Sequence, residues 1–404
     1  MSSVNLGPQL SKTGLLLDLD ASYMRSYSPN VIPNPTDLFA WTSTNQNACT
    51  LSRDTSITRQ YGSIPLKMSI TGNDPYTGTY GSSPWNLAPA ANGQTWTFSF
   101  YAKASENITG NCYIFGANSS GSYIEAPSTS FTITTSWQRF TFSNTFANAS
   151  TAYIQARVGG PATGGSGKTI WWDAFQVERA SSATNFNPYF LGYTIWKDVS
   201  SNNYHSNINN FPPFSSTTPS FFTLNGNNQD FTLPSNFNSG LTSGTWDFWV
   251  NCASLPSSGG NQQIYIQDTC VWFGLYNYGG TTAFGSDLNN GSGWFDNNGG
   301  FNTGARTTST ISANTWYNIT YSWDGINIRI YLNGSLQSTT STLQASNGRQ
   351  NVTVLGAGTT PRSIGSRSGS YFNGKISIAR SFNRALSPTE VSQNYQAMKS
   401  RFGY

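Results

Sequence analysis

Side chains that could perform acid, base or nucleophilic chemistry are scarce in this chain of 404 residues. Glutamate occurs only at positions 106, 125, 178 and 390, and His205 is the only histidine. Glycoside hydrolysis requires two carboxyl groups about 5 to 10 Å apart across the scissile bond. A catalytic triad requires a histidine beside a serine or cysteine nucleophile, but His205 lies in an Asn/Ser-rich stretch without such a motif. The sequence therefore predicts a protein that is not an enzyme, with His205 in a surface turn.

Two aspartates and four cysteines are further candidates for chemistry. Asp18 and Asp20 are two positions apart in a predicted strand, so both side chains lie on the same face. A solvated polar face is the expected role of this pair, and calcium ligation is the alternative. The cysteines lack the spacing of a metal site and are expected to be buried free thiols, with a disulfide between the last two left open: Cys49, Cys112, Cys252 and Cys270.

Aromatic rings are the groups through which this chain could bind a sugar, because a ring face can stack on the apolar side of a pyranose. The candidates for such contacts are Trp172, Tyr276, Tyr278, Trp294 and Phe295. Trp294 and Phe295, within the Asn/Gly-rich segment 289–300, are the best exposed of these candidates, although burial of this loop against a neighbouring segment is favoured slightly over glycan contact. Trp171 and Trp172 are adjacent in a predicted strand, so their rings point to opposite faces and one of them is expected in the core.

The elements that must position these residues are predicted to be mostly strands. Only 9% of the residues are charged while 15% are aromatic, and Asn, Ser, Thr and Gly favour strands and turns over helices. Alternation of residue types predicts strands at 14–20 and 96–103, with Leu15, Leu17 and Leu19 on the buried face of the first. Many short strands separated by turns are typical of a β-sandwich.

The clearest hairpin and the one predicted helix lie in the last hundred residues. Residues 317–323 and 326–332 flank Asp324-Gly325, a pair that tolerates the positive φ of tight turns. One core face is therefore expected for Ile326, Ile328, Ile330 and Leu332. The sequence Ser387-Pro-Thr-Glu390 is a capping box with proline at the first helical position. An apolar stripe continues this helix through Val391, Tyr395 and Met398.

The opening strand is expected to pair with residues 372–382, more than three hundred residues later, and the segment between them has a β pattern of its own. The predicted fold is therefore all-β, with two antiparallel β-sandwich (jelly-roll) domains, one inserted into a loop of the other, and one short C-terminal helix. The predicted domains are an N-terminal arm at 1–13, an outer sandwich at 14–30 plus 190–404, and an inserted jelly roll at 31–189. The polar arm is expected to dock on a partner subunit.

Charge and hydropathy limit the classes of partner. The net charge is +4 without Lys/Arg clusters, so nucleic acid is not expected as a ligand. No apolar run approaches 18 residues and the first ten residues do not resemble a secretory signal, so neither membrane insertion nor export by that route is expected. The low charge removes electrostatic repulsion between copies, which is compatible with a homo-oligomer.

Several segments of the outer sandwich resemble the concanavalin A-like, laminin-G-type sandwich that is common in phage and bacterial surface proteins. The segments that carry the resemblance are residues 14–21, 196–202, 245–250, 316–334 and 372–395. The resemblance implies the fold but not the ligand. Hydrolases with this fold carry Glu-x-Asp-x-Glu along one strand, and this chain has no such run.

The inserted segment resembles the carbohydrate-binding jelly rolls of phage fibres. The segments that carry this resemblance are residues 30–34, 96–103, 136–140 and 171–178. Members of that group often hold a structural calcium near the last strand, which implies Asp173 as a candidate ligand, although the usual Phe-Glu after the opening turn is not evident here. In such a sandwich the first and last strands lie side by side, so both ends of the insert can join one loop of the outer domain.

The resemblances and the scarce ionisable chemistry lead to one preferred function. We expect a non-enzymatic virion structural protein of a tailed phage, either a capsid decoration or a tail or head fibre component. Such a protein is assembled in the host cytoplasm, is displayed on the virion surface, contacts other virion proteins and binds cell-surface carbohydrate without a cofactor other than structural calcium. The alternatives are a bacterial surface lectin or adhesin and a glycan-degrading enzyme.

Overall fold

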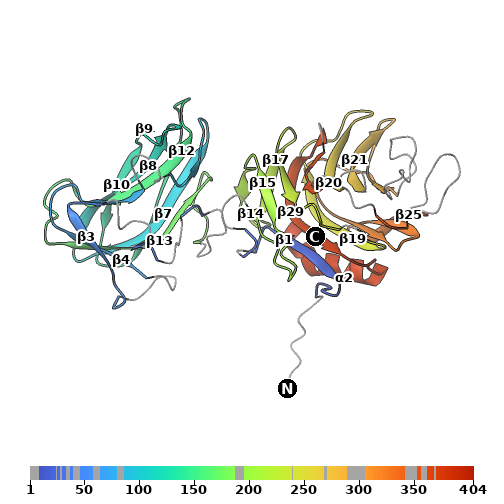
Figure 1. Cartoon of the computed structure of the whole chain (residues 1–404), viewed down its shortest axis with the longest axis horizontal. Coiled ribbons are helices and arrows are strands. Elements are labelled where there is room, and N and C mark those ends of the chain that lie inside the picture. Colours follow the sequence, from blue (N-terminus) through green and yellow to red (C-terminus); the bar gives the residue numbers. More distant parts are fainter. Residues whose placement is uncertain are drawn as a thin grey trace, which may run out of the picture. The chain divides into compact units, whose positions relative to one another are not determined.

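The computed structural model describes residues 9–404 except 24, 28–29, 33–36, 40–45, 58–63, 80–85, 187–194, 239, 268–270, 289–304, 342–352, 356–361 and 368–369. Contacts divide the chain into two compact units. The outer unit consists of residues 1–27 and 194–404, and the inner unit consists of residues 28–193. Both units are built from antiparallel sheets, as predicted from the sequence (Figure 1).

Two sheets form the outer unit. In the described part of the chain, the first has eight strands: β16 (Phe214–Ser215), β17 (Phe221–Asn225), β29 (Asn373–Phe382), β19 (Gly244–Cys252), β23 (Trp316–Trp323), β24 (Asn327–Leu332) and β25 (Ser335–Ser341) in spatial order, with β1 (Leu15–Asp20) also paired to β29. The second has seven: β14 (Ile195–Trp196), β15 (Ser206–Asn209), β18 (Asp230–Leu233), β26 (Arg362–Ile364), β20 (Asn261–Gln267), β21 (Val271–Tyr278) and β22 (Thr281–Leu288). A small ribbon pairs β27 (Ser366–Arg367) with β28 (Ser370–Tyr371).

The main core of the outer unit lies between these two sheets. The first sheet contributes apolar residues such as Phe248 and Ile319, and the second contributes residues such as Phe273 and Leu275. The Phe273 ring stacks on Tyr321 of the opposite sheet with centroids 4.0 Å apart and planes 5° apart. This cross-sheet packing is that of a β-sandwich, in which inward-facing residues of two sheets interdigitate.

The first and last strands of the outer unit pair directly. Leu15 lies opposite Phe382 and Asp20 lies opposite Ile378, which confirms the predicted pairing. The predicted alternation fails at one point, because a register shift between Leu15 and Leu17 interrupts the ladder. Leu17 is therefore in the main core, while Leu15 packs on the other face of the sheet in the cluster around Val391.

The predicted C-terminal helix is confirmed as α2 (Pro388–Met398), and the turn η2 (Lys399–Phe402) follows it. Ser387 Oγ accepts from Glu390 N, and Ser387 N donates to Glu390 Oε2, so the capping box is complete. The helix covers the outer face of the first sheet, where Phe402 stacks on Trp249 at a centroid distance of 3.8 Å. In Figure 1 the red helix lies beside β1 and β19.

The hairpin around Asp324 differs from the prediction at one residue. Asp324 Oδ1 accepts from the backbone N of Ile326 and of Asn327, so the turn extends to Asn327 rather than ending at Gly325. Ile326 is consequently 51% exposed instead of being in the core. Ile328 and the later even-numbered residues of the strand do face the core.

The N-terminal arm contacts its own chain. Ser11 N donates to Asn394 Oδ1 of α2 at 2.8 Å, and Gln393 Nε2 donates to the carbonyl of Gln9. Arg384 Nη2 also donates to Ser11 Oγ at 3.0 Å. Gln9 and Ser11 are therefore held by their own chain, and docking of the arm on a partner subunit stays a prediction.

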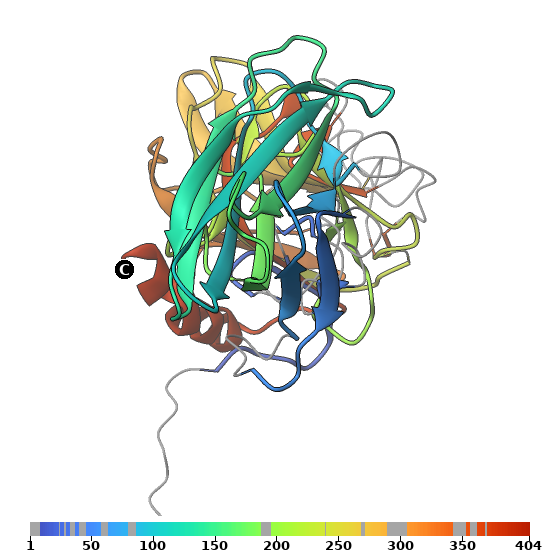
Figure 2. The same cartoon turned by 90° about the vertical axis from the view of Figure 1, so that its left-hand side faces the viewer.

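The inner unit is a second sandwich, shown from another side in Figure 2. One sheet orders β10 (Ser128–Ile133), β8 (Ile108–Ala117), β12 (Tyr153–Gly159), β5 (Tyr76–Thr79) and β2 (Gln46–Asn47), with β6 (Ala88–Pro89) and β9 (Tyr123–Glu125) paired alongside. The other orders β11 (Gln138–Thr145), β7 (Thr95–Ala104), β13 (Thr169–Glu178), β4 (Leu66–Ile70) and β3 (Cys49–Arg53). Trp96, Phe98 and Phe100 of β7 are in its core, as the predicted alternation requires.

The described cysteines are buried free thiols, as predicted for Cys49, Cys112 and Cys252. Burial raises the pKa of the Cys252 thiol to about 12, because the thiolate would lose its hydration. Cys270 lies outside the described residues. Within the described part of the chain, no helix is long and apolar enough to cross a membrane.

Candidate functional site

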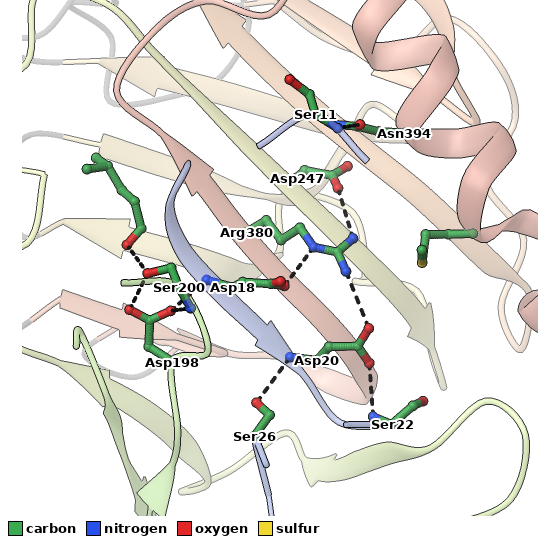
Figure 3. A network of polar contacts seen from close by, with 12 residues as sticks. Ser11, Asp18, Asp20, Ser22, Ser26, Asp198, Ser200, Asp247, Arg380 and Asn394 are labelled. Carbon is green, nitrogen blue, oxygen red and sulfur yellow. Dashed lines mark hydrogen bonds and ion pairs between the residues drawn. The ribbon is translucent and has the colours of Figure 1, made fainter. Parts of the chain in front are cut away.

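The aspartates of the first strand are buried in an ion-pair network (Figure 3). Arg380 Nε of β29 donates to Asp18 Oδ1 at 2.7 Å, and Arg380 Nη2 donates to Asp20 Oδ2 at 3.3 Å. Arg401 binds both carboxylate oxygens of Asp20 at 2.8 Å. The expectation of a solvated face is therefore wrong. Calcium ligation by this pair stays untested, but two guanidinium groups already neutralise its carboxylates.

A third carboxylate completes this network. Asp247 Oδ2 lies 4.0 Å from Arg380 Nη1, and Asp247 Oδ1 accepts hydrogen bonds from Asn318 and Thr320. Burial raises the pKa of Asp247, while Arg380 opposes that shift. Burial alone would lower the pKa of Arg380, but the surrounding carboxylates raise it. The network thus keeps Arg380 charged inside the protein and joins the first strand to the last.

The calcium ligand suggested for the inner unit is a buried residue. Asp173 lies in β13, and its Oδ1 accepts from the backbone N of Ala174 at 2.8 Å. Across the described residues, no three His, Cys, Asp or Glu side chains gather in a group that could hold a metal ion. Asp173 therefore belongs to no such group among the described residues.

A cavity of about 410 Å³ lies beside β22 in the outer unit. The described residues that line it are Tyr276, Thr281, Ala283, Gly285, Arg306, Thr307 and Thr308. Its volume is in the usual range of small-molecule sites, and its described lining combines one aromatic ring with three threonines and one cation. Tyr276, which the sequence predicted as a sugar-binding residue, is thus placed at a pocket.

The pocket exists because small residues occupy the outward face of β21 and β22. Phe273, Leu275 and Phe284 point into the main core, so their neighbours in the strands face away from it. Gly274 pairs with Gly285, and Tyr276 pairs with Ala283. Three of these four outward residues have at most a methyl group as a side chain, and the space beside the tyrosine ring remains open.

Tyr276 is held in place at the wall of this pocket. Its hydroxyl donates to Gln263 Oε1 of the adjacent strand at 3.0 Å. A Cβ atom at Gly274 would lie 2.9 Å from the same hydroxyl oxygen, so glycine is required for this placement of the ring. Only 4% of Tyr276 is exposed, which means that a ligand would meet an edge of the ring.

Arg306 provides the only charged side chain among the described lining residues of the pocket. Its backbone pairs with Gly285, and the flanking Thr307 N donates to the carbonyl of Phe284 at 2.9 Å. On the other side, Arg306 N donates to Ser338 Oγ and the Arg306 carbonyl accepts from it. The backbone is thus fixed between two strands, while the side chain is exposed.

The remaining aromatic candidates have different outcomes. Trp294 and Phe295 lie outside the described residues, as does the side chain of Tyr278. Trp172 is 0% exposed and packs in the core of the inner unit, so its prediction as a glycan-contacting residue is wrong. The reason is the strand alternation, which turns the neighbouring Trp171 outward instead.

Trp171 belongs to a polar and aromatic surface of the inner unit. Its Nε1 donates to Asp54 Oδ2 at 2.9 Å. Lys103 Nζ lies 5.2 Å from the centroid of the Trp171 ring and 6.0 Å from that of Trp137. Both tryptophans are partly exposed. The glycan contact that was predicted for Trp172 therefore fits Trp171 and this surface better.

Sequence reasoning missed a second aromatic group, on the other sheet of the inner unit. The Arg157 guanidinium of β12 lies 4.1 Å from the centroid of Tyr113 and 4.5 Å from that of Tyr76. Tyr113 in turn stacks on Phe115 with planes 4° apart. The available signal was the spacing of Tyr113 and Phe115, which alternate with the core residues of β8.

Comparison with known families supports the fold of the outer unit. Residues 225–392 match the family model described as the concanavalin A-like lectin/glucanases superfamily, laminin G type. This range includes every described residue that lines the pocket at Tyr276. No curated protein sequence matches the chain.

Three solved structures show partial likeness. Domain 4 of AbnA, a GH43 extracellular arabinanase from Geobacillus stearothermophilus in complex with arabinotriose, has 19% identity and a TM-score of 0.39, with 50% of this chain and 92% of that chain covered. A heptameric SAP-like pentraxin from Limulus polyphemus has 18% identity and a TM-score of 0.28, covering 38% and 70%. The receptor binding domain of botulinum neurotoxin C/D mosaic serotype has 13% identity and a TM-score of 0.35, covering 49% and 48%.

Proposed function

We propose that this protein is a non-enzymatic glycan-binding protein and that the pocket at Tyr276 is its binding site in the outer unit. The observation that carries the proposal is the cavity beside β22, which combines an aromatic wall with threonine hydroxyls. Sugars present apolar C–H faces and hydroxyl groups, and this lining complements both. The matched family description names lectins and glucanases, two classes that both act on carbohydrate.

Binding without hydrolysis is favoured by the chemistry of the lining. The described residues around the cavity are neutral apart from Arg306, and hydrolysis of a glycosidic bond uses a pair of carboxyl groups. The buried aspartates of the outer unit serve another purpose, since Arg380 and Arg401 neutralise Asp18 and Asp20. The test is to incubate the protein with polysaccharides and to measure reducing ends. An increase in reducing ends over time would contradict the proposal.

A variant that fills the pocket tests the binding site. Ala283→Phe places a ring in the cavity opposite Tyr276 and should weaken glycan retention at least about tenfold, which corresponds to about 1.4 kcal/mol. Ala149→Phe, at an exposed position of the inner unit, is the matched control and should bind as the unchanged protein does. Glycan-array screening identifies a ligand, and titration calorimetry with it compares the variants. Equal affinity of Ala283→Phe and the unchanged protein would refute the assignment of the site.

We further propose that the protein acts on the virion surface of a tailed phage, where it contacts other virion proteins and attaches the particle to host glycans. The resemblance of both units to phage surface and fibre domains motivates this location, and the low charge of the chain suits a surface that adheres. Immunogold labelling of purified particles is the test. Label restricted to cell envelopes would instead indicate a bacterial adhesin.

A further inference from the structure

We propose that the pocket at Tyr276 selects an acidic sugar, whose carboxylate or sulfate ester binds Arg306. This inference rests on the proposed glycan-binding function and adds the chemical class of the ligand. The two acidic groups share the chemistry that matters here, namely a negative charge spread over several acceptor oxygens. A guanidinium group recognises both through parallel charge-assisted hydrogen bonds.

Among the described residues, the guanidinium of Arg306 has no counter-ion. It makes no hydrogen bond or ion pair with any other described residue, although its backbone is held on both sides. Five other arginines bind a carboxylate within 4.0 Å: Arg53, Arg329, Arg380, Arg384 and Arg401. Arg306 differs from these five because no described carboxylate balances its charge, and it lies at a cavity.

The backbone contacts of Arg306 reduce the entropic cost of using it. Ser338 holds its N and its carbonyl oxygen, at 3.0 and 2.7 Å, and the bridge to Gly285 fixes the opposite side. Only the side-chain torsions remain to be ordered when a ligand binds. A site whose backbone is already positioned loses less conformational freedom on binding, and more of the interaction contributes to affinity.

The neutral part of the lining suits the rest of a sugar. Gln337 Oε1 accepts from the N and the Oγ1 of Thr308, at 3.3 and 3.1 Å, so this threonine is oriented at the rim. Its oxygen can still accept a hydrogen bond from a sugar hydroxyl. Tyr276 and Ala283 supply the apolar contact. One cation, several hydroxyls and one ring edge together match a monosaccharide that carries a single negative group.

Matched acidic and neutral sugars test this inference. The probes are galacturonate and its methyl ester, which differ in charge but not in ring geometry, and galactose 6-sulfate with galactose. Titration calorimetry at low and high salt should show that the unchanged protein binds at least one acidic probe at least about tenfold more tightly than its neutral form. The preference should fall at high salt, because added ions screen an exposed charge.

Two variants identify the residue responsible. Arg306→Gln should lose the preference for the acidic probe and retain the weaker affinity for the neutral one. Arg329→Gln removes the same charge from a residue of the outer unit that pairs with Asp324 and is not among the described lining residues, and it should keep the preference. The carboxylate and sulfate pairs show separately which acidic group the pocket takes.

The outcomes separate this inference from the proposed function. Binding of neutral and acidic probes with equal affinity, abolished by Ala283→Phe, would overturn the inference and leave glycan binding intact. An acidic preference that survives Arg306→Gln would also overturn it. If neither these probes nor any glycan on an array is bound, the proposed function itself fails.

Discussion

Removal of Arg380 should destabilise the outer unit strongly. Its guanidinium contacts Asp18 and Asp20 and lies 4.0 Å from Asp247, and all four residues are buried. Arg380→Met keeps most of the side-chain volume but removes the charge. In this variant Asp20 keeps its ion pair with Arg401. Asp247 keeps its hydrogen bonds to Asn318 and Thr320. Asp18 is therefore the carboxylate that loses most of its electrostatic compensation.

The magnitude follows from the cost of an unpaired buried charge. Removing one partner of a buried ion pair typically costs about 3 to 5 kcal/mol. Because Asp18 keeps a little contact with solvent and its neighbours keep other partners, we expect about 3 kcal/mol, at the low end of that range. The matched control is Arg329→Met, which breaks the partly exposed pair with Asp324 and should cost at most about 1 kcal/mol.

Urea unfolding measures this difference, since urea, unlike guanidinium chloride, does not screen ion pairs. Intrinsic fluorescence follows the transitions, and hydrogen exchange assigns each of them to a unit, because a chain with two units need not unfold in one step. Adding Asp18→Asn to Arg380→Met should restore part of the loss by removing the orphaned charge. A cost for Arg380→Met no larger than that for Arg329→Met would refute the reasoning.

Two further predictions concern the inner unit and the C-terminal helix. Trp172→Ala should cost about 3 to 5 kcal/mol in urea unfolding, because it empties a fully buried site, whereas Trp171→Ala should cost far less; equal losses would contradict this assignment of faces. Hydrogen bonds from Arg384 lower the pKa of Glu390 from 4.5 to about 2, so its stabilising effect is complete above pH 4.5 and disappears as the pH falls toward 2. Melting temperatures of Glu390→Gln, measured between pH 4.5 and 2, should lack this pH-dependent component. If they fall with pH as steeply as those of the unchanged protein, Glu390 does not contribute it.

Local signals in the sequence located most elements but not the partners of individual side chains. The capping box at Ser387 identified α2 because every group involved lies within four residues. Asp18 and Asp20 were predicted to be solvated because the arginines that pair with them are more than 350 positions away in the chain. Sequence pattern alone does not reveal pairings of that separation.

The pocket shows the same limit. Tyr276 was predicted as a candidate from its residue type, but Arg306 was not, because nothing near it in the sequence indicates that it crosses back to β22. Alternation placed Trp171 and Trp172 on opposite faces without showing which face is covered. That choice depends on which face packs against the opposite sheet of the inner unit, whose strands, such as β8, are distant in the sequence.

The pairing of β1 with β29 also determines the order in which this protein can mature on the ribosome. The first strand is translated before the inner unit, whereas its partner is translated more than 350 residues later. All residues of the inner unit are synthesised in the meantime, so that sandwich can fold while the nascent chain is still growing. Until β29 has been translated, β1 has an unpaired hydrogen-bonding edge, and a chaperone that binds extended segments would find its substrate there.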